Sequence, residues 1–193
     1  GQNLRRADLR GAKLEGANLR KADLYYADLS GAMLSEAVLV GADMRGANFK
    51  GANLRNASLI GDLAGADLRG TKLSNAGLGG NLRGVNFKGA DLRNASLDGD
   101  FSGADLSGLN LSNSSVFGSN FEGANLRGVN FTNASLGTAN FSKADLTGAN
   151  LSSAILDNSN LTGVNLSSAN LNNIDLSGED LTDANLSNIN LQE

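Results

Sequence analysis

A large apolar residue recurs every five residues along the whole chain. If this residue is taken as the centre of a five-residue unit, the 193 residues contain 39 centres, of which 31 are Leu, six are Phe, and the others are Met44 and Val116. Ala stands two positions before the centre in 24 units, and the position between them is usually Asn, Asp or Ser. The fold must therefore bury a small and a large residue at a fixed interval of five.

Neither a long helix nor a long strand satisfies a period of five. Successive centres on a helix with 3.6 residues per turn would point to every side, and each Gly inside a helix costs roughly 1 kcal/mol. A strand alternates with period two, so an odd period would move the centres from one face to the other. A short extended piece followed by a turn does fit, because the small residue and the centre share one face. The pattern predicts a solenoid with a filled interior.

Three shortened units indicate how many units form one coil. Successive centres are four residues apart instead of five at Leu59 and Leu63, at Leu78 and Leu82, and at Leu97 and Phe101. The shortenings are spaced by 19 residues, the length of four units less one residue, so each falls at the same corner of a four-sided coil. Each brings a Gly to that corner (Gly61, Gly80 and Gly99), where we expect a tightened bend with an unusual φ. The 39 units then form nearly ten coils.

The repeated unit A-(D/N)-L-x-x, as in A-D-L-R-G and A-N-L-R-K near the N-terminus, closely resembles the pentapeptide repeat family. The resemblance covers essentially the whole chain, so we expect residues 1–193 to form one domain. It implies an all-β fold, a right-handed quadrilateral β-helix with four five-residue units per coil. It also implies a protein without catalytic activity, and some members of the family resemble duplex DNA and act on DNA gyrase.

The composition removes most catalytic chemistry. The chain has no Cys, hence no thiol nucleophile or thiolate metal site, and no His, hence neither the usual general base nor the usual zinc ligand. The carboxylates match no calcium loop, and no Gly-rich loop continues into G-K-S or G-K-T. We therefore expect no enzyme activity, cofactor, metal ion or small-molecule substrate. No apolar run is long enough for a membrane span.

The charges are unevenly distributed along the chain. Residues 1–97 contain 14 Lys and Arg against nine acids, a net charge of +5. Residues 98–193 contain two basic residues, Arg127 and Lys143, against 11 acids, a net charge of −9. Two interpretations stay open: drift of solvated surface positions among the repeats, and a rod whose halves meet different partners.

One of the four faces has more outward apolar residues than the others. It carries the units centred on Leu19, Leu39 and Leu59 and continues to Leu176, and it borders the shortened corner. Its outward positions include five large apolar residues: Val38, Val40, Ile60, Phe117 and Ile155. Their gathering on one face predicts a contact surface, although scattered apolar surface residues need no such explanation.

Basic residues also align at the position after the centre. Lys50, Arg69, Lys88 and Arg127 share one face, Arg55 and Arg93 a second, and Arg45 and Arg83 a third. Such columns could follow a phosphate backbone. No aromatic residues are interleaved, however, and acids stand beside the columns at Asp43, Asp67 and Asp91. A solvated charged surface is the favoured interpretation, and nucleic acid is not expected as a partner.

A few units depart from the repeat. Glu179 occupies an inward position that is elsewhere kept for a small residue. Because an unpaired buried carboxylate is costly, we expect the last coils to be loosened. Leu109, Ser114 and Ser119 replace Ala in successive units, which predicts repacking near the middle of the rod.

Three functions are compatible with these features. The favoured one is a non-catalytic scaffold or accessory domain that binds a protein partner. The second is self-assembly, in which copies associate end to end into fibres or face to face, because open strand edges promote association. The third is a DNA mimic acting on DNA gyrase, which the basic N-terminal half disfavours. The cytoplasm is favoured over the extracellular space, which would suit a fibre.

Overall fold

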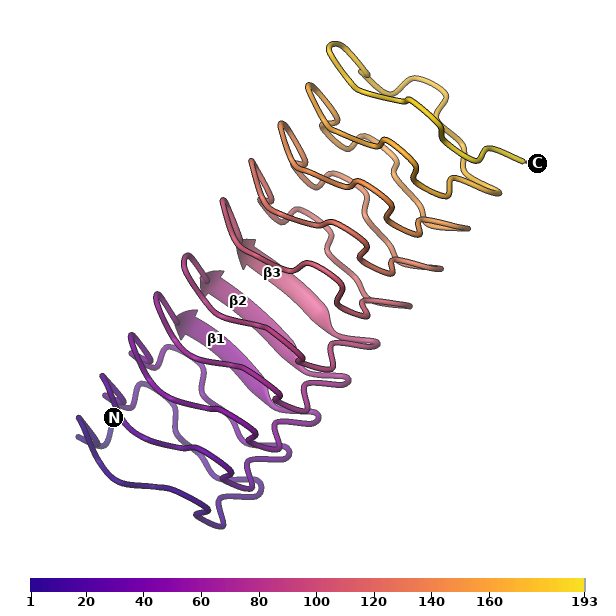
Figure 1. Cartoon of the computed structure of the whole chain (residues 1–193). Coiled ribbons are helices and arrows are strands. Elements are labelled where there is room, and N and C mark those ends of the chain that lie inside the picture. Colours follow the sequence, from indigo (N-terminus) through magenta and orange to yellow (C-terminus); the bar gives the residue numbers. More distant parts are fainter. Residues whose placement is uncertain (193) are drawn as a thin grey trace.

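The computed structural model describes residues 1–192, which wind into a rod of stacked coils (Figure 1). Three parallel strands lie side by side along the rod: β1 (Ser58–Asp62), β2 (Gly77–Asn81) and β3 (Ser96–Asp100). Elsewhere the coils pair through single bridges between residues 20 apart, such as Asp8 with Asp28, or 19 apart, such as Asn48 with Asp67. The fold is all-β, a right-handed quadrilateral β-helix, which confirms the fold class predicted from the sequence.

The bridging residues divide each coil into four walls, which we number in chain order. The columns of bridging residues begin at Asn3 in the first wall, Asp8 in the second, Lys13 in the third and Asn18 in the fourth. Each bridging residue stands directly before a centre, so every wall has centres inside and bridging residues outside. That residues 1–193 act as one domain stays a prediction.

Between two walls the chain turns within four residues. At the corner after the first wall, Ala7 N donates to Leu4 O (3.1 Å), and Arg6 between them has a φ of 54°. A four-residue turn with a positive φ at its third residue is a type II turn, and this position favours Gly or Asn. Among residues 1–192, seventeen residues other than Gly nevertheless occupy positive φ, including Thr138. Each such residue costs about 1–2 kcal/mol, less for Asn and Asp.

Where Asn or Asp stands before a centre, its side chain stabilises the turn that follows. Asp28 Oδ1 accepts a hydrogen bond from Ser30 N (3.0 Å), and Asn48 Oδ1 accepts one from Lys50 N (3.0 Å). These are Asx turns, which Asn and Asp favour. Asn48 Nδ2 also donates to Asp28 Oδ1 (3.0 Å), so amides and carboxylates form a ladder between coils. The outward Asn and Asp therefore have a structural role.

Backbone hydrogen bonds join each coil to the next in a fixed pattern. Leu29 N donates to Asn48 O in the following coil (2.7 Å), and Asn48 N donates back to Ala27 O (2.9 Å). Gly31 N donates to Lys50 O (2.9 Å). Each regular unit thus directs two donors to the following coil and one to the preceding coil, and these bonds run along the rod.

The interior is filled by columns of centres and of the small residues before them. Centres from Leu19 to Leu171 are buried, and so are most of the Ala residues that precede them. On the first wall, Phe101, Phe121 and Phe141 stack in a column with ring centroids 4.9 and 5.3 Å apart. Like side chains meet in this way because successive coils are spaced by about 4.8 Å.

The shortened corner differs from the prediction. We expected a tightened bend at Gly61, Gly80 and Gly99, but β1, β2 and β3 each run extended through the corner from the fourth wall to the first. Because one residue is missing, no turn forms here, and the backbone stays extended across the corner. Of the three glycines only Gly80 has a positive φ, of 92°. The strands stay in register, with Gly80 opposite Gly61 and Gly99.

Glycine is needed at this corner because neighbouring coils approach closely. A Cβ on Gly80 would collide with the carbonyl oxygen of Gly61, and a Cβ on Gly61 would collide with that of Ala42. A Cβ on Gly99 would lie 2.5 Å from Leu82 Cδ1. Gly61 and Gly99 are therefore required because they have no side chain, and not because they can adopt a positive φ.

A serine forms hydrogen bonds to the last strand of the sheet, β3, at the point where the coil length changes from 19 back to 20 residues. Ser119 stands at an inward small position in the coil after β3, and its side chain is buried. Its Oγ donates to Leu97 O (2.6 Å) and accepts from Gly99 N (3.4 Å). The repacking expected at Ser119 thus takes the form of hydrogen bonds to the last shortened coil.

The last coil is loosened on two walls, as the position of Glu179 predicts. Within residues 1–192, bridges from the preceding coil reach Asn185 and Asn190, but none reaches Asp175 or Asp180. The Glu179 carboxylate accepts a hydrogen bond from a backbone N–H of the preceding coil (2.8 Å). This bond gives the carboxylate a partner and replaces the regular pairing of the fourth and first walls.

Candidate functional site

The five apolar residues of the predicted contact face lie on the fourth wall in two columns. Val38 and Ile155 are bridging residues, and the column after the centres holds Val40, Ile60 and Phe117. Ile60, Phe117 and Ile155 are 46%, 60% and 54% exposed, whereas the two valines are half-buried. At about 4.8 Å per coil, the distance from Val38 to Ile155 is about 29 Å. We call these five residues the apolar strip.

Glycines in the following coil make room for two side chains of the apolar strip. A Cβ on Gly79 would lie 3.5 Å from Ile60 Cγ2, and a Cβ on Gly137 would lie 3.7 Å from Phe117 Cδ2. Both glycines occupy outward positions and are nevertheless buried. The exposed Ile60 and Phe117 therefore each pack on one side against a glycine and present the other side to solvent.

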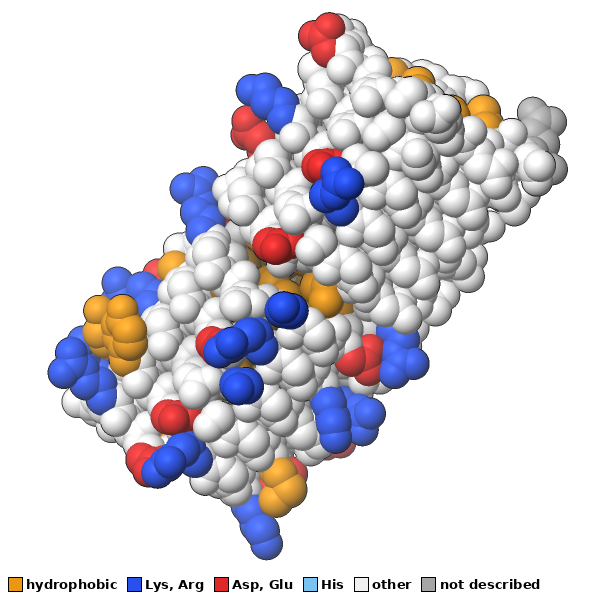
Figure 2. All heavy atoms as spheres, viewed as in Figure 1, with side chains coloured by type: hydrophobic (Ala, Val, Ile, Leu, Met, Phe, Trp, Pro, Cys, Tyr) orange, Lys and Arg blue, Asp and Glu red, His pale blue; other side chains and the backbone are white. Residues whose placement is uncertain are grey.

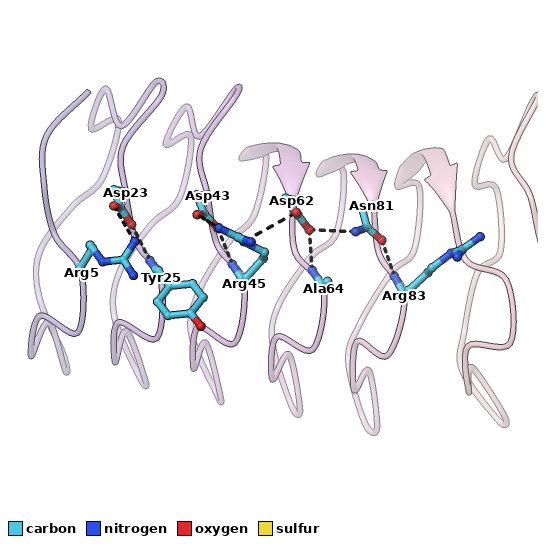
Figure 3. A network of polar contacts seen from close by, with 9 residues as sticks. All are labelled: Arg5, Asp23, Tyr25, Asp43, Arg45, Asp62, Ala64, Asn81 and Arg83. Carbon is cyan, nitrogen blue, oxygen red and sulfur yellow. Dashed lines mark hydrogen bonds and ion pairs between the residues drawn. The ribbon is translucent and has the colours of Figure 1, made fainter.

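The first wall carries a charged network in place of an apolar strip (Figure 3). Arg5 Nη1 pairs with Asp23 Oδ2 (3.1 Å), and Arg45 Nη2 pairs with Asp43 Oδ2 (2.6 Å). Tyr25 lies between the two arginines, whose Cζ atoms are 4.4 and 5.2 Å from its ring centroid. This aromatic ring is thus covered by cations on the wall surface.

The network continues past the shortened corner (Figure 3). Asp62 Oδ1 accepts hydrogen bonds from Ala64 N (3.1 Å) and from Asn81 Nδ2 (3.0 Å). In the next coil, Arg83 Nε pairs with Asp100 Oδ2 (2.6 Å). These carboxylates already have partners within the protein itself.

Arginine partners lower the pKa of neighbouring carboxyl groups. Hydrogen bonds from Arg10 lower the pKa of Asp8 to about 2. On the same wall, a side-chain hydrogen bond from Arg69 is the main cause of the lowered pKa of Asp67. Both groups stay ionised at neutral pH, so neither is suited to act as a general acid there.

The aligned basic residues stand beside acids, as the sequence indicates. Arg69 pairs with Asp67 (2.6 Å), and Arg127 pairs with Asp145 of the following coil (2.9 Å). On the face shown in Figure 2, charged side chains of both signs gather on the N-terminal half of the rod, and the C-terminal half carries fewer, although residues 98–193 still contain 13. This mixture favours a solvated charged surface over one that follows a phosphate backbone.

In the part of the chain that the structure describes, no group of three or more Asp, Glu, His or Cys is placed to hold a metal ion. No helix in residues 1–192 has the length and apolar character needed to cross a membrane.

One surface feature was not predicted from the sequence, a hollow on the second wall near the middle of the rod. It lies between the coil segment 84–88 and the segment 103–109. The signal was present in Leu109, which replaces an inward Ala, but its effect on the neighbouring wall does not follow from the repeat pattern alone.

A sequence model described as Pentapeptide repeats (8 copies) matches the chain almost throughout. The matched segments are residues 3–39, 22–61, 62–99, 100–133, 124–163 and 159–193. One segment ends at Gly61 and another at Gly99, which are two of the three shortened corners. A regular repeat restarts after each of these positions.

Solved structures of similar proteins have the same fold. The crystal structure of HetL, a pentapeptide repeat protein involved in heterocyst differentiation regulation from a Nostoc cyanobacterium, matches at 31% identity with a TM-score of 0.51. The match covers 98% of this chain and 86% of that one. Trypsin-treated QnrB1, a plasmid-mediated fluoroquinolone resistance protein, matches at 20% identity and a TM-score of 0.50, over 100% and 88% of the two chains. A comparison with curated proteins gave no match.

Proposed function

The chain belongs to the pentapeptide repeat family, and from this premise we propose that it is a non-catalytic scaffold whose apolar strip binds a protein partner. Members of this family are in general structural and interaction proteins. HetL, the relative that shares 31% identity, is described as involved in regulation, a role that suits a protein without chemistry of its own.

The exposure of large apolar side chains on one wall carries the proposal. Five large hydrophobic residues are exposed in the described part of the chain, and three of them, Ile60, Phe117 and Ile155, lie on the fourth wall. Exposed large apolar side chains on a polar protein are typical of interaction sites, and here they are separated along the wall by polar residues such as Asp98. Aromatic and aliphatic anchors of this kind carry much of the binding energy in protein interfaces.

The wall around the strip is suited to a protein partner. Hydroxyl groups of Ser58, Ser96, Ser115 and Ser135 occupy the bridging column between the apolar residues, and they offer hydrogen bonds without charge. Ile60 stands in β1, so the backbone beneath this part of the strip is ordered before binding and loses little entropy on association.

The test is affinity capture with a paired control. In the test variant, Ile60→Asp and Phe117→Asp place charges in the strip, where burial against a partner would be costly. In the control variant, Ser35→Asp and Ser112→Asp introduce the same charges on the third wall. We expect a specific partner to bind the wild type and the control alike and the test variant at least about tenfold more weakly, a loss of about 1.4 kcal/mol.

Partners that bind all three proteins equally would contradict the proposal. Light scattering of the same proteins tests self-assembly, because association that persists in the absence of any other protein would favour copies of the chain as the partner. A gyrase supercoiling assay tests the DNA mimic, which the mixed charges of residues 1–97 make the least supported of the three functions.

A further inference from the structure

On the fourth wall, the column after the centres carries opposite charges at its two ends. Eight successive coils contribute one residue each to this column, and we number these coils one to eight in the order Arg20, Val40, Ile60, Gly79, Asp98, Phe117, Gly137 and Asp157. A cation stands in coil one and a carboxylate in coil eight, and the apolar residues of the column lie between them. The column therefore has a direction along the rod.

The charged groups in coils one and eight form no ion pair within residues 1–192. Arg20 and Asp157 are both exposed. Seven of the ten arginines of the chain are paired with an Asp, and neither Arg20 nor Asp157 takes part in any of these pairs. Both charges are therefore available to a molecule that covers the fourth wall.

The two large exposed residues of the column lean toward the following coil. Ile60 reaches over Gly79, and Phe117 reaches over Gly137, as the short distances from these glycines to the two side chains show. Ile60 thus stands above the wall between coils three and four, and Phe117 stands above it between coils six and seven. A partner that fits this surface must leave space at these two heights along the rod.

A second copy of the chain fits the order of charges when its rod runs in the opposite direction. A two-fold axis that crosses the wall between coils four and five brings each column opposite the same column of the second copy in reverse order. Coil one then faces coil eight. Arg20 stands opposite Asp157 of the second copy, and the symmetry forms this pair twice.

The same register also fits the apolar side chains. Phe117, between coils six and seven, faces coils two and three of the second copy and enters between Val40 and Ile60. Ile60 faces coils five and six, so the raised side chains of the two copies alternate and do not meet head-on. A shift of one coil in either direction separates Arg20 from Asp157, and one of the two shifts places Asp98 opposite Asp98.

The bridging column contributes uncharged groups near the axis. In this register Ser58 faces Ser115, and Gly77 faces Ser96. The serine hydroxyls can donate and accept hydrogen bonds, and no like charges meet in the bridging column there.

We propose that the fourth wall binds the fourth wall of a second copy, with the two rods antiparallel about an axis between coils four and five. This inference rests on the proposed function, because it names the partner of the apolar strip. In a parallel arrangement Arg20 would stand beside Arg20 and Asp157 beside Asp157, so charge selects the antiparallel one. A two-fold interface of this kind is closed and ends at the dimer.

The size of the wall sets the strength of the dimer. Eight coils at about 4.8 Å extend over about 34 Å, and the wall is about 10 Å wide, three residues at about 3.3 Å each. The flat area is about 340 Å² per copy, well below the roughly 800 Å² per partner of a standard stable complex. We therefore expect a reversible dimer with a dissociation constant of roughly 100 μM.

The test is sedimentation velocity of charge variants, at protein concentrations from about 10 μM to about 1 mM. Arg20→Asp alone and Asp157→Arg alone each place like charges opposite one another twice in the dimer. We expect each variant to dimerise at least about tenfold more weakly than the wild type. An equal mixture of the two variants forms a mixed dimer in which both pairs are again opposite in charge, and its affinity is expected to return to that of the wild type.

Matched variants on the third wall control for the change in net charge. Arg55→Asp and Glu15→Arg occupy the position after the centre on that wall, and they are expected to leave dimerisation unchanged, alone and mixed. The strip variant Ile60→Asp with Phe117→Asp is expected to stay monomeric up to about 1 mM. Its control, Ser35→Asp with Ser112→Asp, is expected to dimerise as the wild type does.

Three results would overturn the proposal: a wild type that stays monomeric over the whole range, single charge variants that dimerise as tightly as the wild type, and association that grows beyond the dimer. The last result would assign association to the ends of the rod. A monomeric wild type that still captures another protein through the strip would overturn this inference alone. Capture that is equal for the wild type, the strip variant and its control would instead overturn the proposed function.

Discussion

Two parts of the rod depart from the five-residue repeat, and they respond in opposite ways. At β1, β2 and β3 each coil has lost a residue, yet the strands pair in register with Gly61, Gly80 and Gly99 aligned. At the hollow no residue is missing, but Leu109 stands where an Ala is usual, and six backbone N–H groups make no hydrogen bond of ordinary geometry, although the bridge between Asn86 and Asp105 persists. A change in circumference is tolerated when neighbouring coils share it, whereas the added volume of Leu109 coincides with weakened pairing to the preceding coil.

The two departures differ in whether the neighbouring coil carries a matching change. A shorter corner repeated in successive coils gives each strand a partner of equal length, and the pairing is complete. A large inward side chain has no matching space above or below it, because Ala90 precedes it in the stack. The rod therefore depends more on the match between adjacent coils than on any one coil length.

The largest effect is expected from closing the space at the shortened corner. Gly80→Ala combines a positive φ with a collision against the Gly61 carbonyl oxygen, so we expect a loss of about 2–5 kcal/mol in the free energy of unfolding. Gly123→Ala has the positive φ (62°) but open space, and about 1 kcal/mol is expected. Urea unfolding followed by circular dichroism measures all three proteins, and equal losses for the two variants would contradict the role assigned to close approach.

A smaller effect separates the two kinds of inward leucine at the hollow. Leu106→Ala removes a fully buried centre and is expected to cost about 2–5 kcal/mol. Leu109→Ala is expected to cost less than about 1 kcal/mol, because the coils can then close and regain backbone hydrogen bonds worth about 1 kcal/mol each. The same urea experiment compares them. Equal losses would mean that Leu109 is an ordinary core residue and does not hold the coils apart.

The smallest effect concerns charge at the end of β3. Burial raises the pKa of Asp100, but hydrogen bonds from Ser102 and Arg83 outweigh it, and the net pKa lies below the ordinary value. A lowered folded pKa means that Asp100 stabilises the fold above the unfolded pKa of about 3.9 and that this contribution is lost as pH falls through the folded pKa. The contribution is below about 1 kcal/mol because the pair is partly exposed.

An NMR titration of the Asp100 carboxyl carbon measures this pKa directly. In Arg83→Gln the pKa is expected to rise toward its ordinary value. Arg127→Gln, which removes the partner of Asp145 on the second wall, is the control and should leave the Asp100 titration unchanged. An unchanged pKa in Arg83→Gln would assign the shift to the hydrogen bonds from Ser102 instead.

Much of the fold could be predicted from the sequence because the repeat is strict. The spacing of the centres predicts the solenoid, and the three shortenings predict four walls, since both depend only on counting residues. The local geometry of Gly61 and Gly99 could not be predicted, because a deletion can tighten a bend or remove it. The choice depends on whether the neighbouring coil offers an extended partner, and this is a property of two coils together.

The candidate site was predicted only as a set of positions. The sequence places Val38, Val40, Ile60, Phe117 and Ile155 on one face, and the structure puts them on the fourth wall, but their function as a contact surface stays a prediction. The difference in exposure between Phe117 and the half-buried valines follows from glycines in the next coil. The hollow was missed because the effect of Leu109 appears in the backbone of other residues.

The direction of the inter-coil hydrogen bonds has a mechanical consequence. Because these bonds lie along the rod, a pull on its two ends loads the coil interfaces in series, and every interface carries the same tension. A chain of links in series yields at its weakest link, and in this rod the interface with the most weakened backbone hydrogen bonds between residues 1 and 170 lies beside Leu109. Under tension the rod would therefore part first beside Leu109, into two stiff segments joined by a hinge.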